Sequence, residues 1–204
     1  MTGVDEQLYE DETDVMEALF GEGEQGQGGG VLVHLRQDRE QGARSWLLLS
    51  AQDIDVARQE WNRAGVALLR CGALFAAVRI DADLVHAAAG TSDDGEVNEY
   101  LAAVLAGPVF RSQHRGRYYA LVPASAAARR EWRERRYAPH AECLGLGSYV
   151  GVPRPDLDRP DRHISYWCVP MSGPGDLCDA GAVSQLLGYG RHVMAMAGVL
   201  GARK

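Results

Sequence analysis

The sequence predicts an α+β fold with a mixed, largely antiparallel sheet flanked by helices. Short apolar segments such as residues 75–81 (FAAVRID) recur along the chain, and their alternating polarity is typical of strands. Segments with apolar residues three and four positions apart, which are typical of helices, lie between them. Residues 107–113 and 117–123 flank the sequence HRG and are expected to form an antiparallel hairpin. Strands and helices mixed in this order favour an α+β domain.

The predicted elements follow one another from residue 31 onward. Residues 31–35 (VLVHL) and 45–50 (SWLLLS) are expected to be the first two strands. A helix over 51–65 should be capped near Asp53, because an aspartate side chain accepts hydrogen bonds from the free N–H groups of a first turn. In this helix Trp61 shares one face with the other apolar residues. Further strands are expected at 65–72, 74–81, 147–153 and 164–170, and further helices at 82–90, 94–107, 125–136 and 179–200.

The charge is distributed unevenly along the chain. The formal net charge is −7, but residues 1–30 hold nine acids and neither lysine nor arginine. Without those nine, 19 of the 28 acids stand against 21 bases, so residues 31–204 carry about +2. A nearly neutral body does not by itself indicate a protein that binds nucleic acid, although it has enough charge to form a local basic groove.

The chain is expected to consist of an acidic tail with a glycine-rich linker, residues 1–30, and one α+β domain, residues 31–204. The linker is residues 21–30 (GEGEQGQGGG), whose composition is typical of flexible segments. Residues 11–21 (DETDVMEALFG) place four apolar side chains on one helical face. The tail is therefore either a disordered, loosely docked acidic segment or a docking segment, for a protein partner or for the domain's own basic groove.

The sequence also predicts the compartment. No apolar run approaches the roughly 18–20 residues needed to span a bilayer, and the first residues lack the basic start and apolar stretch of a signal peptide. We expect a cytoplasmic protein with no membrane contact. Its four cysteines form no CxxC pair and are expected to be small buried hydrophobic residues. The alternative is a zinc site of Cys143, Cys168 and Cys178 with His140 or His163, whose spacing differs from common zinc motifs.

Two acids one residue apart follow the strand predicted at 74–81. Strand alternation puts Arg79, Asp81 and Asp83 on one face and apolar side chains on the other. Two such carboxylates have the geometry to share a pair of hard cations about 4 Å apart, as in phosphoryl transfer, and their oxygen ligands suit Mg²⁺ or Mn²⁺. The alternative is that Asp83 caps the following helix while Asp81 is solvated at the strand end.

The order of motifs resembles the primase–polymerase (prim-pol) domain of the archaeo-eukaryotic primase superfamily. Asp81 and Asp83 are followed by HRGRYYALVP (114–123) and then by AECLGLGSYVGVP (141–153). This matches the family's order of an acidic pair, a glycine-rich turn leading into a strand, and a third acid before another glycine-rich strand. The resemblance covers roughly residues 45–170 and implies a prim-pol/RRM-like core in which Asp81, Asp83 and Glu142 hold Mg²⁺ or Mn²⁺.

Two phosphate-binding groups of the family pattern are missing. The family's histidine in the glycine-rich turn corresponds to Tyr118, which does not become a cation as histidine does. Where the family often has an arginine just after the third acid, this chain has Leu144. Arg79, Arg115 and Arg117 are the candidates to supply the missing positive charge. These departures are typical of a degenerate or specialised copy.

The sequence therefore leaves three hypotheses. The first is a metal-dependent nucleotidyltransferase of the primase or polymerase type, acting on a nucleoside triphosphate and DNA in replication or repair. In it, Asp81, Asp83 and Glu142 are the catalytic and metal-binding residues, and Tyr118 with Arg115 or Arg117 contacts the triphosphate. The second is a catalytically inactive interaction or regulatory module of the same fold, and the third is an unrelated globular protein.

A basic stretch adds one more candidate surface. Residues 129–136 (RREWRERR) hold five arginines around Trp132. Such a helix either follows a phosphate backbone, with the tryptophan stacking on a base, or is a solvated face whose charges pair locally.

Overall fold

The computed structural model describes residues 27–112, 116–133, 140–160 and 165–201. The chain divides into two compact units, Met1–Gln37 and Asp38–Lys204, and the strands all belong to the second. Residues 1–26, and with them most of the predicted acidic tail, lie outside the described residues. Among the helices that are described, none combines the length and the apolar character needed to cross a membrane.

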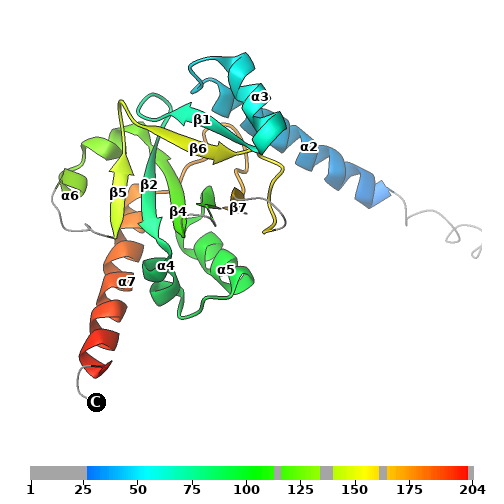
Figure 1. Ribbon diagram of the computed structural model, residues 1–204. Coiled ribbons are helices and arrows are strands. Elements are labelled where there is room, and N and C mark those ends of the chain that lie inside the picture. Colours follow the sequence, from blue (N-terminus) through cyan, green and yellow to red (C-terminus); the bar gives the residue numbers. More distant parts are fainter. Residues whose placement is uncertain (1–26, 113–115, 134–139, 161–164, 202–204) are drawn as a thin grey trace, which may run out of the picture. The chain divides into compact units, whose positions relative to one another are not determined.

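A five-stranded sheet forms the centre of the second unit (Figure 1). Every neighbouring pair of its strands is antiparallel, so the predicted α+β fold with an antiparallel sheet is confirmed. The predicted hairpin is also present, because β3 and β4 are paired neighbours. The strand order is β5 (Ala141–Leu144), β2 (Phe75–Asp81), β4 (Arg117–Pro123), β3 (Val109–Ser112) and β7 (Ser165–Val169).

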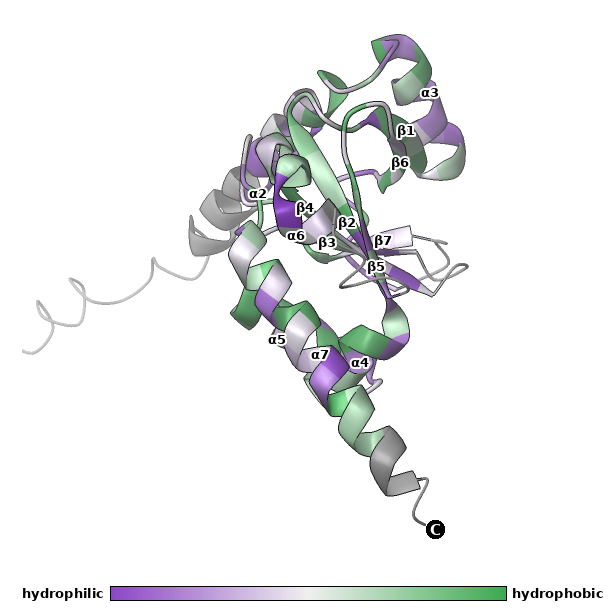
Figure 2. Ribbon diagram, turned by 90° about the vertical axis from the view of Figure 1, so that its left-hand side faces the viewer, coloured by the Kyte–Doolittle hydropathy of each residue, from purple (hydrophilic) through white to green (hydrophobic). Residues whose placement is uncertain are grey.

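One face of this sheet is covered by helices α4 (Ala82–Ala89), α5 (Asp94–Leu105) and α7 (Ala180–Gly201). Alternate residues of β2 and β4, including Ile80 and Tyr118, point into this first core together with apolar residues of the three helices. Helix α5 starts at an Asp93 side chain that accepts a hydrogen bond from the Glu96 N–H, 3.0 Å away. Figure 2 shows how hydrophobic residues are distributed over these elements.

The other face carries a second core. It is covered by the last turns of α2 (Gln27–Leu48), by α3 (Ile54–Ala64) and by a two-stranded sheet of β1 (Val66–Arg70) and β6 (Tyr149–Pro153). Trp61 of α3 is buried here, and its Nε1–H donates to the Val152 carbonyl at 2.9 Å. Helix α3 begins at Asp53, whose carboxylate accepts from the Asp55 and Val56 N–H groups as the sequence predicted.

Three predicted elements differ in the structure. Residues 31–35 and 45–50 belong to helix α2 and are not strands. The apolar run at 45–50 is too short for its periodicity to decide between helix and strand. Ala43 and Leu47, four residues apart, are both buried in the second core, which is the helical spacing. The predicted basic helix is a 3₁₀ turn, η2 (Ala124–Ala128), followed by the short α6 (Arg130–Arg133), and 134–139 lie outside the described residues.

Candidate functional site

Asp81 and Glu142 lie on the same face of the sheet, although 60 residues separate them in the chain. In the strand register Glu142 of β5 is opposite Arg79 of β2, and Asp81 follows Arg79 by two residues. Diagonal neighbours of this kind lie roughly 7–8 Å apart, and their β-carbons are somewhat closer. These two acids, which are distant in the sequence, therefore lie near each other on the sheet.

Asp83 does not join them. Strand β2 ends at Asp81 and helix α4 begins at Ala82, so Asp83 belongs to the helix. The strand alternation that predicted Asp83 on the same face as Asp81 does not extend that far. Asp83 is exposed in the first helical turn. The alternative prediction was that Asp83 caps this helix. It is also wrong, because Asp81 occupies the N-cap position, and its side chain makes no capping hydrogen bond.

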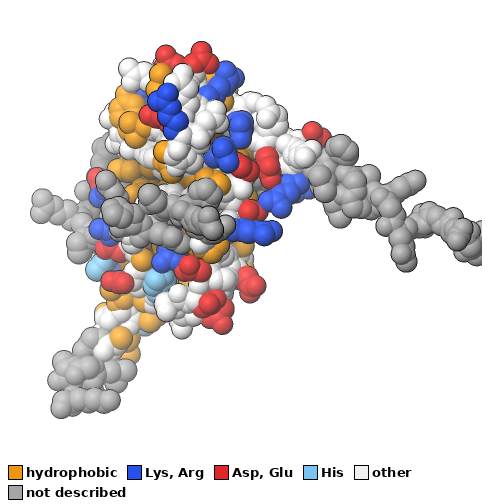
Figure 3. All heavy atoms as spheres, turned by 45° about the vertical axis from the view of Figure 1, so that its right-hand side comes forward, with side chains coloured by type: hydrophobic (Ala, Val, Ile, Leu, Met, Phe, Trp, Pro, Cys, Tyr) orange, Lys and Arg blue, Asp and Glu red, His pale blue; other side chains and the backbone are white. Residues whose placement is uncertain are grey.

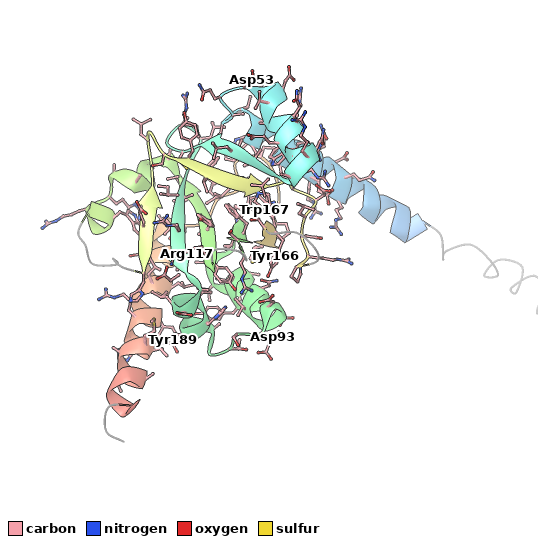
Figure 4. All side chains as sticks on the ribbon, in the orientation of Figure 1. Asp53, Asp93, Arg117, Tyr166, Trp167 and Tyr189 are labelled. Carbon is pink, nitrogen blue, oxygen red and sulfur yellow. The ribbon has the colours of Figure 1, made fainter. Side chains whose placement is uncertain are left out.

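Arginines pair with both acids that converge. The Arg79 Nη2 donates to Glu142 Oε2 at 2.5 Å, and Arg117, which is opposite Asp81 in the register, forms an ion pair with it. His140 Nδ1 lies 3.5 Å from the other Asp81 oxygen. Figure 4 labels Arg117 at the start of β4. We call these five residues the sheet-end charge cluster.

This arrangement does not fit the two-cation site that the resemblance implies. A divalent cation at the cluster would first have to displace the guanidinium groups, because the lone pairs of both carboxylates already face positive charge. Within the part of the chain that the structure describes, no three His, Cys, Asp or Glu side chains form a group that could hold a metal ion. The sequence identified the acids but not their partners, since cross-strand pairing decides which arginine meets which carboxylate.

The predicted nucleotide-binding residues are also separated. Tyr118 is fully buried and shares a face with Ile80, which points into the first core, whereas Arg117 and Asp81 point to the opposite face. Tyr118 therefore has no access to a triphosphate held by Asp81 and Glu142. Its hydroxyl instead lies 3.3 Å from His86 Nε2. Arg115 lies outside the described residues.

Tyr118 belongs to a buried polar cluster that the sequence analysis missed. Arg111 is its cross-strand neighbour on β3, with the guanidinium carbon 5.2 Å from the centre of the tyrosine ring. Arg111 forms an ion pair with Asp94 at the start of α5. On the other side of Arg111 lies Tyr166 of β7, labelled in Figure 4, whose pKa burial raises to about 12. The only signal in the sequence was an arginine at the end of an apolar strand.

His86 gives this buried polar cluster a pH dependence. Burial lowers the pKa of His86 below its ordinary value, and the positive charge of Arg111 lowers it further. The unfolded chain, in which histidine titrates near pH 6.5, therefore takes up more protons than the folded chain as the pH falls. The contribution of neutral His86 to stability is complete above about pH 6.5 and is lost as the pH falls through its lower folded pKa.

We expect the His86→Gln variant to lose less stability than the wild-type protein between about pH 7 and about pH 5. Glutamine does not titrate, and its amide keeps a hydrogen-bonding group beside the Tyr118 hydroxyl. Urea unfolding followed by circular dichroism at several pH values measures this difference. Parallel loss of stability in the two proteins would contradict the assignment.

Three of the four cysteines are small buried residues, and Cys143 is half-buried. All four are free thiols, and Cys71, Cys168 and Cys178 are buried. Burial raises the pKa of Cys143 to about 11 and that of Cys178 to about 12, which keeps these thiols protonated near neutral pH. None of the described cysteines belongs to a possible metal group, and His163, one alternative ligand of the predicted zinc site, lies outside the described residues.

Comparison of this chain with family models, with curated proteins and with solved structures gave no match. The prim-pol resemblance therefore rests on the order of the motifs alone and stays a prediction.

Proposed function

We propose that this protein is a non-catalytic interaction or regulatory module that acts through a protein partner. The observation that supports this most directly is the pairing of Arg79 with Glu142 and of Arg117 with Asp81. These pairs place two arginine side chains where a nucleotidyltransferase needs divalent cations. In this proposal the sheet-end charge cluster has a structural role. It helps to hold the end of the sheet in place and determines the charge of the surface there.

On the face shown in Figure 3, the distribution of surface charge also favours a protein partner over nucleic acid. Basic and acidic side chains are interspersed there. A protein that follows a phosphate backbone needs a continuous basic stripe, since each phosphate contact is made by a separate lysine or arginine. Residues 1–30, with nine acids and the apolar face of 11–21, are the segment we propose to contact the partner.

Nucleotidyl transfer with Mg²⁺ or Mn²⁺, a nucleoside triphosphate and DNA is the second candidate. It is favoured by the shared face of Asp81 and Glu142 on adjacent strands. It also requires the guanidinium groups to leave the carboxylates when the cations bind. Arg79 is 40% exposed, so its ion pair with Glu142 is screened by water and is worth little in free energy.

The two candidates differ in their response to Mn²⁺. If the arginines occupy the site permanently, millimolar MnCl₂ should not raise the melting temperature of the wild-type protein. The Arg79→Gln/Arg117→Gln variant should acquire such a rise, because it frees both carboxylates, and adding Asp81→Asn should remove it again. Differential scanning fluorimetry with MnCl₂ and with a matched NaCl control measures these shifts.

An activity assay completes the test. We expect no incorporation of labelled nucleotides on a primed DNA template by the wild-type protein with Mg²⁺ or Mn²⁺. Incorporation that Asp81→Asn or Glu142→Gln abolishes would overturn the non-catalytic proposal. Pull-down with the full chain tests the positive part, because Leu19→Ser/Phe20→Ser should reduce partner recovery while Thr2→Ser should not.

A further inference from the structure

Exposed hydrophobic side chains gather on and beside the two-stranded sheet of β1 and β6. Among the residues that the structure describes, nine large hydrophobic side chains are exposed to solvent. Six of the nine lie on these strands, on α3 or in the turns next to them: Leu49, Ile54, Val56, Leu68, Leu146 and Tyr149. Apolar surface concentrated in this way is typical of an interaction site.

Three of these side chains are joined by printed contacts of their neighbours into one surface, the end patch, which consists of Val56, Leu68 and Tyr149. Leu68 is opposite Gly151 in the strand register, so it shares the solvent-exposed face of the sheet with Tyr149. The Leu68 N–H donates to Glu60 Oε2 at 2.8 Å, and Val56 lies one turn before Glu60 on α3. The Tyr149 hydroxyl lies 3.5 Å from Gln52 Oε1, just before that helix.

Two arginines border the end patch. Arg70 lies on the same exposed face as Leu68 and is opposite Tyr149 in the register. Arg63 is seven residues after Val56 on α3, which places it two turns along the same helix face. Within the described part of the chain, neither arginine makes a hydrogen bond or an ion pair.

The acids at this end of the molecule are engaged in other bonds. Glu60 accepts from the Leu68 N–H, Asp53 caps α3, and Asp55 pairs with Arg58. The positive charges of Arg63 and Arg70 are therefore the ones available to a partner. The end patch thus favours a partner segment that combines apolar side chains with acids.

Residues 11–21 of this chain have that composition. They hold four acids, neither lysine nor arginine, and four apolar residues at helical spacing: Val15, Met16, Leu19 and Phe20. We propose that the end patch binds residues 11–21 of a second copy of the protein. This inference rests on the proposed function, in which residues 1–30 contact a protein partner, and it identifies that partner. Reciprocal exchange of the two segments gives a closed two-fold dimer.

The end patch of the same chain is too far away along the backbone for the segment to reach. Helix α2 has 22 residues and ends at Leu48, so it is about 33 Å long. Ser50, two residues further on, accepts a hydrogen bond from the Arg70 N–H, so the helix ends beside β1. Leu19 is eight residues before Gln27, the first residue of α2, and eight extended residues span at most about 29 Å.

Sedimentation velocity of the full-length protein tests the proposal. We expect a monomer–dimer equilibrium with a dissociation constant on the order of 100 μM, since contacts of this size are usually weak. Raising the NaCl concentration from about 0.05 M to about 0.5 M should weaken the dimer by about threefold or more, because salt screens the charges at an exposed patch.

Substitutions in the end patch should separate it from other exposed apolar residues. Val56→Gln/Leu68→Gln should weaken the dimer about tenfold or more, because it removes apolar surface that the contact would bury. Val104→Gln/Met196→Gln is the matched control. Both residues are exposed but lie on α5 and α7, outside the end patch, and this variant should dimerise like the wild type.

Mixing two variants tests whether the segment of one copy binds the patch of the other. Leu19→Ser/Phe20→Ser should weaken the dimer as much as the patch variant does. An equimolar mixture of the two variants retains one intact contact between unlike copies, so it should associate more strongly than either variant alone.

Charge exchange tests the role of the arginines. Arg63→Glu/Arg70→Glu should weaken the dimer about tenfold or more. Adding Glu12→Arg/Glu17→Arg to this variant should restore most of the affinity, because the opposite charges again face each other.

Several results would overturn the inference. They are a wild-type protein that stays monomeric at about 1 mM, a control variant weakened as much as the patch variant, or a mixture no stronger than its components. Melting temperatures show whether each variant is folded, and the variants at residues 19 and 20 keep the test valid if the patch variant is not.

Failure of this inference can be told apart from failure of the proposed function. If the chain stays monomeric while a different protein is recovered through Leu19 and Phe20, the inference fails and the proposed function stands. Nucleotide incorporation that depends on Asp81 would overturn the proposed function, whereas dimerisation through the end patch does not depend on that residue.

Discussion

Replacing Asp94 with alanine is expected to lower the free energy of unfolding by about 3 kcal/mol. The Arg111 side chain is only 16% exposed, and it lies against the ring of Tyr118. Without Asp94 its charge would remain in this half-buried position with no carboxylate to compensate it. The cost of removing one partner of such a pair is therefore much larger than the net contribution of the pair itself.

Urea unfolding at neutral pH measures this loss, and two further variants locate its cause. Glu99→Ala removes an exposed acid from the same helix, α5, and should change stability by less than about 0.5 kcal/mol. Asp94→Ala/Arg111→Met removes both charges and should recover most of the loss, because a methionine fills the space without an unpaired charge. A loss below about 1 kcal/mol for Asp94→Ala alone would mean that Arg111 is effectively solvated.

Replacing Gly190 with alanine is expected to destabilise the protein by about 2 kcal/mol, whereas Gly188→Ala should stabilise it by about 1 kcal/mol. Both glycines lie inside helix α7, so alanine gains the same helix propensity at each. A β-carbon at Gly190 would lie 2.7 Å from the Leu84 carbonyl oxygen of α4 and 2.8 Å from its side chain. A β-carbon at Gly188 meets nothing within 4 Å.

The pair of substitutions therefore tests the close contact between α4 and α7 separately from helix propensity. Thermal and urea unfolding of the two variants should give opposite signs, with a difference of about 3 kcal/mol. The contact bears on the site because α4 begins directly after Asp81. If both variants were stabilised equally, the two helices would be further apart than the structure has them.

The sequence predicted much of the fold because local patterns encode it. The short, largely apolar runs of β2 and β4 are typical of strands, and the structure pairs them with their apolar residues divided between two separate cores. The cap of α3 at Asp53 was also predictable, since a cap depends only on neighbouring N–H groups. Helix α2 was not, because a short apolar run fits either element until its partner surface is known.

The candidate site was predicted in part. Asp81 and Glu142 lie on one face of the sheet, but Asp83 lies in the first turn of α4 and does not join them. Placing Tyr118 beside these acids failed because neighbouring residues on a strand point to opposite faces.

By itself, the sequence determined the α+β class, the antiparallel sheet and the residues that carry charge, because these follow from local periodicity and composition. Only the tertiary structure decided which charges meet. The pairing of β2 with β4 and β5 sets Arg117 opposite Asp81 and Arg79 opposite Glu142. The register is fixed by burying the apolar residues of each strand, so the same packing that builds the two cores also places an arginine on each acid.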